Sequence, residues 1–137
     1  VALTVGRGGW LDWLPQETIL FDRAALDRRT VIDLAPDAGC LALEAVVLGR
    51  AAMGETVRDI RFRDRREIRR GGAPVWIDPL ALTPDALSGT ATLTGARAFA
   101  TIVMTGEAAL PPLRAVLDEP GVAAEASAFA GRTVLRM

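Results

Sequence analysis

The run from Cys40 to Leu48 constrains the fold most, because every residue in it is apolar except Glu44. A strand with one wet face alternates apolar and polar side chains, whereas a strand covered on both faces is apolar throughout. The run therefore predicts a strand with a layer on each side. Glu44 then lies either at the rim of the sheet or in the interior, where a carboxylate needs a partner. We favour a rim position or a structural hydrogen bond over a functional acid.

A second constraining stretch is residues 10–22, which hold two of the three tryptophans of the chain. Pro15 has no backbone N–H, so it predicts the end or the edge of a strand. The apolar run Thr18–Phe21 then predicts a buried strand. Two acids, Glu17 and Asp22, stand at its ends, and any functional interpretation has to explain them.

The rest of the chain predicts a mainly β protein with one helix. The helix is expected at Ala108–Glu119, because its apolar residues recur at helical spacing and Pro120 follows it. Arg23–Arg29 reads as a short connection and Leu80–Gly95 as an irregular loop. Further strands are expected at Val1–Val5, Thr30–Leu34, Val57–Arg70, Pro74–Pro79, Ala96–Thr105, Val122–Phe129 and Thr133–Met137.

Composition excludes several classes of function. The 137 residues predict one domain and include no histidine, which excludes Ser-His-Asp triads, Cys-His dyads and most zinc sites. The single cysteine, Cys40, cannot form an internal disulfide, and we interpret it as a buried apolar thiol in a reducing cytoplasm. The net charge of −1 argues against a nucleic-acid arm or a basic membrane patch.

Two local patterns also resemble binding motifs without matching them. The loop Leu48–Glu55 has two glycines but neither the spacing nor the lysine of a phosphate-binding loop. The arginines of Val57–Arg70 are interspersed with acids and have no aromatic side chains on the charged face, so we favour a solvated strand face over a nucleic-acid stripe. No stretch is long and apolar enough to span a bilayer, and no cleavable signal opens the sequence. A soluble, cytoplasmic protein is expected.

Three blocks in order carry a resemblance to a known family: Trp13–Asp22, Leu48–Glu55 and Phe99–Gly106. Together they resemble the urease accessory protein UreD, also called UreH, and the resemblance covers the whole chain. Members of that family are about twice as long. The resemblance therefore implies that residues 1–137 form a single domain that is an incomplete portion of a UreD-type protein, without the N-terminal strands and the basic C-terminal helical tail.

The resemblance implies a fold of stacked mixed sheets, β-helix-like, with one or two short α-helices. It implies a non-enzymatic chaperone for nickel insertion into the urease apoprotein, acting with UreF and the GTPase UreG. It implies no tightly bound cofactor, with Ni²⁺ as the transferred ion. Neither nucleic acid nor a membrane is expected as a partner, because the net charge is −1.

A protein that passes Ni²⁺ onward is expected to offer oxygen ligands, because imidazole and thiolate hold late first-row ions strongly. The acids in or beside the motif blocks and the buried strand are candidates for a transient nickel path: Glu17, Asp22, Glu44 and Glu55. Structural, hydrogen-bonded acids are an equally good interpretation. Arg50, in the second block, is a candidate for partner contact.

Two readings from other classes remain open. An enzyme of the glycosidase type would need two carboxylates facing each other across a cleft. A β-rich interaction domain without a metal role would have the same composition. Exposed strand edges and apolar faces of an incomplete fold also predict self-association.

Overall fold

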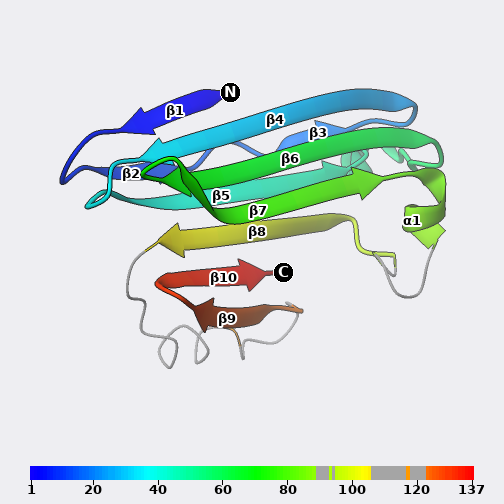
Figure 1. The fold of residues 1–137 in the computed structure, drawn as a ribbon. Helices are drawn as coiled ribbons and strands as arrows, with labels where there is room; N and C mark the ends of the chain where they lie inside the picture. The colour runs from blue at the N-terminus through cyan, green and yellow to red at the C-terminus, as the bar shows by residue number, and fades with distance from the viewer. Residues whose placement is uncertain (89–92, 94, 106–116, 118–122) are drawn as a thin grey trace.

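The protein consists of two stacked β-sheets, seen in a computed structural model that describes residues 1–88, 93, 95–105, 117 and 123–137 (Figure 1). The mainly β class and the stacked mixed sheets predicted from the sequence are confirmed. The elements are β1 (Ala2–Val5), β2 (Trp10–Trp13), β3 (Thr18–Leu20), β4 (Ala24–Leu34), β5 (Gly39–Leu48), the 3₁₀ turn η1 (Ala51–Met53), β6 (Ile60–Arg70), β7 (Ala73–Leu82), α1 (Pro84–Ser88), β8 (Ala98–Thr105), β9 (Glu125–Phe129) and β10 (Arg132–Arg136).

Sheet A has the order β1-β4-β6-β7, with β1, β4 and β6 parallel and β7 antiparallel to β6. Sheet B has the order β2-β5-β8-β10-β9, with β3 also paired to β5. In sheet B, β2 and β3 run parallel to β5, and the later pairs are antiparallel. Each sheet is therefore mixed.

The turn between β6 and β7 depends on Gly71 and Gly72, whose φ angles of +56° and +83° lie in the left-handed region. Residues with a Cβ adopt this region only at a cost, so two glycines allow the tight hairpin between β6 and β7. Pro74 and Pro79 lie in β7, which is the edge strand of sheet A. Proline is tolerated in an edge strand because its missing N–H can face away from the neighbouring strand.

Two apolar clusters fill the space between the sheets. The first contains Val5, Ile32, Leu34, Ala38, Cys40, Ile68, Trp76, Val103 and Val134. The second contains Leu20, Val46, Ile60, Phe62 and Leu82. Cys40 is fully buried in the first cluster, and burial raises the pKa of its thiol. Its predicted position as an apolar thiol is therefore confirmed.

The sequence prediction was wrong at three places. Arg23–Arg29 is not a connection, because β4 begins at Ala24 and pairs with β6 along its whole length. Hydrogen bonding to β6 keeps these polar residues in a strand, although the residue types alone do not favour one. Leu80–Gly95 is not a loop throughout, since β7 continues to Leu82 and α1 follows.

The third error concerns Thr18–Phe21, which was predicted to be buried. Only Leu20 of this run is buried, whereas Ile19 is 44% exposed and Phe21 45% exposed. The strand β3 has only three residues, and alternation turns Ile19 away from the interior. The helix predicted at residues 108–119 lies, apart from Leu117, outside the described residues.

The strand β5 is present as predicted, but only one of its faces is well covered, where a layer was expected on both. Cys40, Glu44 and Val46 face sheet A and are buried, while Leu41 and Leu43 on the other face are half-buried. Among the described residues, no helix is long and apolar enough to cross a membrane.

Candidate functional site

A group of polar and charged side chains lies between the two apolar clusters, inside the stack of sheets. We call it the interior network, and it consists of Thr18, Arg28, Glu44, Asp64, Arg66 and Asp78. Strands of both sheets supply it, with β3 and β5 on one side and β4, β6 and β7 on the other. The interior of this β protein therefore contains a layer of charge as well as apolar packing.

Arg28 is the centre of the interior network. Its Nε and Nη2 atoms donate to the two carboxylate oxygens of Asp64 at 3.1 and 2.8 Å. Its Nη2 also lies 2.7 Å from Oε1 of Glu44. Its Nη1 donates to Thr18 Oγ1 at 2.8 Å, and that hydroxyl donates to Glu44 at 3.2 Å. One guanidinium thus holds two carboxylates, in the forked geometry that arginine favours.

Local sequence explains why these side chains meet. In β6, Ile60 and Phe62 face the interior, so strand alternation also turns Asp64 inward. The parallel register places Arg28 directly beside Asp64 on the neighbouring strand. The Arg28 guanidinium also lies 5.5 Å from the centre of the Phe62 ring, where cation and aromatic face attract each other.

A second arginine extends the interior network toward β7. Arg66 donates through Nη2 to Asp78 at 2.6 Å, and its Nε lies 3.3 Å from Asp64. Arg136 of β10 reaches the other oxygen of Asp78 at 3.2 Å. With Arg136 included, three arginines face three carboxylates, so the positive and negative charges balance.

This balance is needed because the carboxylates are removed from water. Asp64 is 2% exposed and Glu44 7% exposed, and unpaired buried charges are costly. Burial alone would lower the pKa of Arg28, but the hydrogen bond to Asp64 and the charges of Glu44 and Asp64 outweigh it and raise that pKa. Arg28 therefore stays protonated in the interior.

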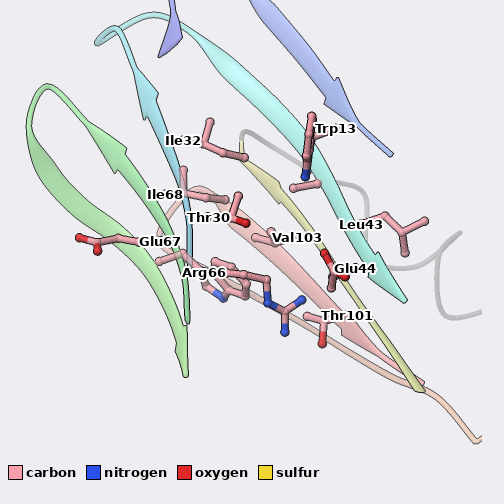
Figure 2. Close-up of a pocket in the computed structure, with 12 residues that line it drawn as sticks. Trp13, Thr30, Ile32, Leu43, Glu44, Arg66, Glu67, Ile68, Thr101 and Val103 are labelled. Atoms are coloured by element: carbon pink, nitrogen blue, oxygen red, sulfur yellow. The ribbon is translucent and has the colours of Figure 1, made fainter. Parts of the chain in front are cut away.

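A small cavity of about 20 Å³ adjoins this network. Figure 2 shows Glu44 of β5 and Arg66 of β6 lining it, together with Trp13 and Thr101. This volume is enough for about one water molecule. Arg66 is one of the residues that line the cavity, and its Nε atom is buried without a hydrogen-bond partner. A sugar ring would not fit, so Glu44 and Asp64 do not form the open carboxylate pair of a glycosidase.

The four acids predicted to line a nickel path occupy three different places. Glu44 lies in the interior network. Glu17 is exposed, directly before Thr18, whose hydroxyl contacts Glu44. Asp22 and Glu55 lie together at the surface, where the connection from β3 to β4 meets the loop after η1.

Asp22, Arg50 and Glu55 form what we call the loop cluster. The Asp22 carboxylate accepts from the backbone N–H groups of Arg58 and Asp59 at 2.7 and 2.9 Å, and these two hydrogen bonds lower its pKa. Glu55 accepts from Arg50 Nε at 2.9 Å and from the Asp22 N–H at 3.3 Å. The hydrogen bond from the Arg50 side chain is the main reason that the pKa of Glu55 is lowered.

Arg50, predicted as a partner contact, has side-chain partners within the chain. Besides its bonds to Glu55, its guanidinium lies 4.5 Å from the centre of the Phe21 ring. Within the described residues, no three Cys, Asp or Glu side chains are grouped so that they could hold a metal ion. Asp22, Glu44 and Glu55 thus have hydrogen-bond or ion-pair partners within the chain, and the nickel path stays a prediction.

The sequence did not predict the roles of Arg28, Asp64 and Arg66, which organise the interior. A signal was available for Asp64, because the alternation of Ile60 and Phe62 extends to position 64. No sequence signal was available for Arg28, since its segment was predicted as a connection and its partner lies 36 positions away. Only the parallel pairing of β4 with β6 brings the two side chains together.

The fold and the interior network define a mainly β protein built on two mixed sheets with a charged layer inside. The family model described as "UreD urease accessory protein" matches residues 1–137. The chain therefore belongs to the UreD family of urease accessory proteins, which confirms the resemblance carried by the three sequence blocks.

Curated relatives agree with this assignment. A "Urease accessory protein UreD" of Cereibacter sphaeroides is 62% identical over 143 residues, which cover 100% of this chain and 52% of the relative. A protein of the same name from Paracoccus denitrificans is 55% identical, covering 98% of the chain and 50% of the relative. A third, from Jannaschia sp., is 46% identical, covering 98% and 52%. The chain thus spans about half the length of these relatives, which are named as accessory proteins and not as enzymes.

Proposed function

We propose that this chain is part of a UreD-type scaffold for nickel insertion into the urease apoprotein, working in a complex with UreF and the GTPase UreG. The observation that carries the proposal is the family match along the whole chain, with relatives named as urease accessory proteins. The nickel ion is cargo in this role, so the scaffold should contact it without retaining it. Cytoplasmic localisation is part of the same proposal.

The chemistry of the chain supports a transient contact. It has no histidine and one cysteine, and that cysteine is buried in an apolar cluster. Carboxylates and hydroxyls are then the available ligands, and such oxygen ligands hold a late first-row divalent ion less strongly than imidazole or thiolate. Release toward the urease apoprotein is therefore favoured.

Glu44 and Glu17 are the acids best placed for a path. Glu17 is exposed and precedes Thr18, which links it to the buried Glu44 through a side-chain hydrogen bond of 3.2 Å. In this proposal a cation passes from Glu17 to Glu44. It would compete there with Arg28, which lies 2.7 Å from the Glu44 carboxylate, and this competition would keep the contact short-lived.

Asp22 and Glu55 are less available for the same task. Both carboxylates already accept hydrogen bonds from backbone N–H groups of neighbouring segments. A cation that took their oxygens would have to replace these bonds. In this proposal Asp22 and Glu55 stay candidate metal contacts of second rank, and Arg50 positions Glu55.

The test is urease activation with a chimera, in which residues 1–137 replace the matched half of the Cereibacter sphaeroides relative. Glu44→Gln and Glu17→Gln, separately and together, should reduce the nickel content of urease while complex assembly stays normal. Asp37→Asn, an exposed acid in the turn before β5, is the matched control. Full activation by the double variant with normal assembly would exclude Glu17 and Glu44 as nickel contacts.

Partner capture tests the scaffold itself. The chimera should co-purify with UreF, with UreG and with the urease apoprotein. A β-rich interaction domain without a metal role would bind none of these three, so the same experiment separates the two functions.

A further inference from the structure

The face of sheet A that is turned away from sheet B carries more arginine than acid. Strand alternation in β4 and β6 turns one set of side chains into the interior and the other set outward. We call the outward set the arginine face, and its charged members are Arg29, Arg61, Arg63, Arg65, Arg69, Asp27, Asp33 and Glu67. Because the whole chain has a net charge of −1, positive charge is concentrated on this face.

Glu67 lies within the arginine face and holds three of its arginines. Its carboxylate is approached by Arg69 at 2.9 Å, by Arg29 at 3.5 Å and by Arg65 at 3.7 Å. Figure 2 shows the Glu67 side chain directed away from the cavity that Arg66 lines. One carboxylate offers about four acceptor positions, whereas each guanidinium has about five N–H donors. The donors of these three arginines therefore outnumber what Glu67 can accept, and Glu67 also orients them.

Arg61 and Arg63 extend the arginine face along β6. Both are exposed, and within the residues that the structure describes neither side chain forms an ion pair with a carboxylate. A hollow of about 340 Å³ adjoins them, lined also by Ala25, Leu26 and Asp27 of β4. Among these five residues two are cations and one is an anion, so the hollow attracts an anionic group from outside.

The arginines of β6 have a regular spacing. Arg61, Arg63 and Arg65 follow one another at every second position, so their Cα atoms are about 7 Å apart. A polypeptide in extended conformation repeats the side chains on one of its sides with the same spacing. A planar guanidinium also pairs with a carboxylate through two parallel hydrogen bonds.

We propose that the arginine face binds an extended acidic segment of a partner protein, whose carboxylates at every second position pair with the three arginines of β6. The charge of the face and the spacing of its arginines carry this inference. It goes beyond the proposed role in nickel insertion and does not depend on it.

Two features favour a protein segment over a nucleic acid on this face. Asp27, Asp33 and Glu67 stand among the arginines. They would repel the evenly spaced phosphates of a nucleic acid, whereas a peptide can place neutral residues beside them. The neighbouring row on β7 is apolar, with Ile77 42% exposed and Pro79 also at the surface. Apolar side chains of a protein can cover this row, while a phosphate backbone gains nothing from it.

Two labelled synthetic peptides test the proposal by fluorescence anisotropy with the full-length chimera described above. Both consist of four glutamates and six serines. Glutamate occupies every second position in the first peptide, which turns all four carboxylates to one side of an extended chain. It occupies every third position in the second, which turns only two carboxylates to each side. The first peptide should bind about tenfold more tightly, because it forms more charge-assisted hydrogen bonds with the arginines. Equal affinities, or no binding of the first peptide, would overturn the proposal.

Charge reversal tests whether these arginines bind the peptide. The double variant Arg61→Glu, Arg63→Glu of the chimera should bind the first peptide at least about tenfold more weakly. The double variant Arg7→Glu, Arg97→Glu makes the same charge change at two exposed positions outside the arginine face, and it should bind like the wild type. If the reversal at positions 61 and 63 unfolds the chimera, Arg61→Gln with Arg63→Gln replaces it with the same expectation. Unchanged affinity in a folded variant would contradict the proposal.

Two further measurements separate the other occupants. A single-stranded DNA decamer should bind the chimera more weakly than the first peptide, and tighter binding of the DNA would show that the face is a nucleic-acid site instead. In light scattering, a monomer, or a dimer that both double variants leave intact, agrees with the proposal. A dimer that is lost only in the Arg61→Glu, Arg63→Glu variant would show that a second copy occupies the arginine face, and the proposal would then be wrong.

Discussion

The interior network and the loop cluster both hold carboxylates with arginine, yet the two regions differ in what the arginine does. In the interior, Arg28 neutralises Glu44 and Asp64, which are 7% and 2% exposed. In the loop cluster, Arg50 is itself exposed, with 51% of its side-chain surface accessible. Water can solvate the charges of Arg50 and Glu55. The buried charge of Asp64 has to be compensated by its arginine partner instead.

The difference shows that burial, more than distance, decides what an ion pair contributes. The shortest contact of Arg28 is 2.7 Å and that of Arg50 is 2.9 Å, so the two geometries are nearly equal. Removing one partner of a buried pair leaves a charge without compensation, while an exposed pair is screened. Loss of Arg28 should therefore have a far larger effect than loss of Arg50.

The largest expected effect is that of Arg28→Met on stability. The variant leaves Glu44 and Asp64 buried without their shared cation, and the free energy of unfolding should fall by about 3–5 kcal/mol. Urea unfolding at neutral pH measures this. The matched control is Arg29→Met, on the neighbouring position of β4, because Arg29 is 59% exposed and pairs with Glu67 at 3.5 Å. The control should lose about 0–1 kcal/mol, and equal losses in both variants would contradict the comparison.

The comparison also explains which parts of the fold the sequence could predict. The apolar run of β5 and the alternation in β6 reflect burial of single strands, and local pattern reports that burial directly. The strand β4 was predicted only in its second part, Thr30–Leu34, since Asp27, Arg28 and Arg29 carry charge. Their strand conformation comes from pairing with β6. Such long-range pairing cannot be recognised from the pattern of a short stretch of sequence.

The candidate site was predictable to a similar degree. Glu44 stood out because it interrupts an apolar run, and it is indeed buried in the interior network. Asp22 stood out at the end of the apolar run Thr18–Phe21 and Glu55 through the family resemblance, and the structure gives both of them backbone partners in a loop. The charges that balance Glu44 come from Arg28 and Arg66 on other strands, so only the assembled sheets reveal them.

A smaller effect is expected for Asp22→Asn, and it should depend on pH. The backbone N–H groups of Arg58 and Asp59 lower the pKa of Asp22 below its ordinary value of 3.8. A depressed pKa in the folded state stabilises the protein above the unfolded-state value, and this contribution is lost as the pH falls through the folded-state value. The variant should therefore be less stable than the wild type at pH 7, by less than Arg28→Met.

The difference between wild type and Asp22→Asn should then shrink once the pH falls below about 3.8, where the wild-type carboxylate takes up its proton. Unfolding curves at several pH values measure it. Asp37→Asn, which changes an exposed acid in a turn, serves as the control. A difference that stays constant down to pH 2 would show that the hydrogen bonds of Asp22 do not depend on its charge.

The smallest effect is expected for Arg50→Ala. This change removes the hydrogen bonds that lower the pKa of Glu55, together with the contact to Phe21, but the Asp22 N–H still reaches Glu55. Because Arg50 is exposed, the electrostatic part of the loss should weaken with salt, as the screening length falls from about 10 Å at 0.1 M to about 3 Å at 1 M. Arg50→Lys keeps the charge but not the forked geometry, so it should retain the salt-dependent part only. Thermal unfolding of both variants at the two salt concentrations measures this.

The same measurement applies to Arg28→Met. Because the partners of Arg28 are buried, the stability lost in Arg28→Met should change far less over the same range of salt. A salt dependence as large for Arg28→Met as for Arg50→Ala would mean that water reaches Glu44 and Asp64. The ion pairs of the interior network would then be screened like ion pairs at the protein surface.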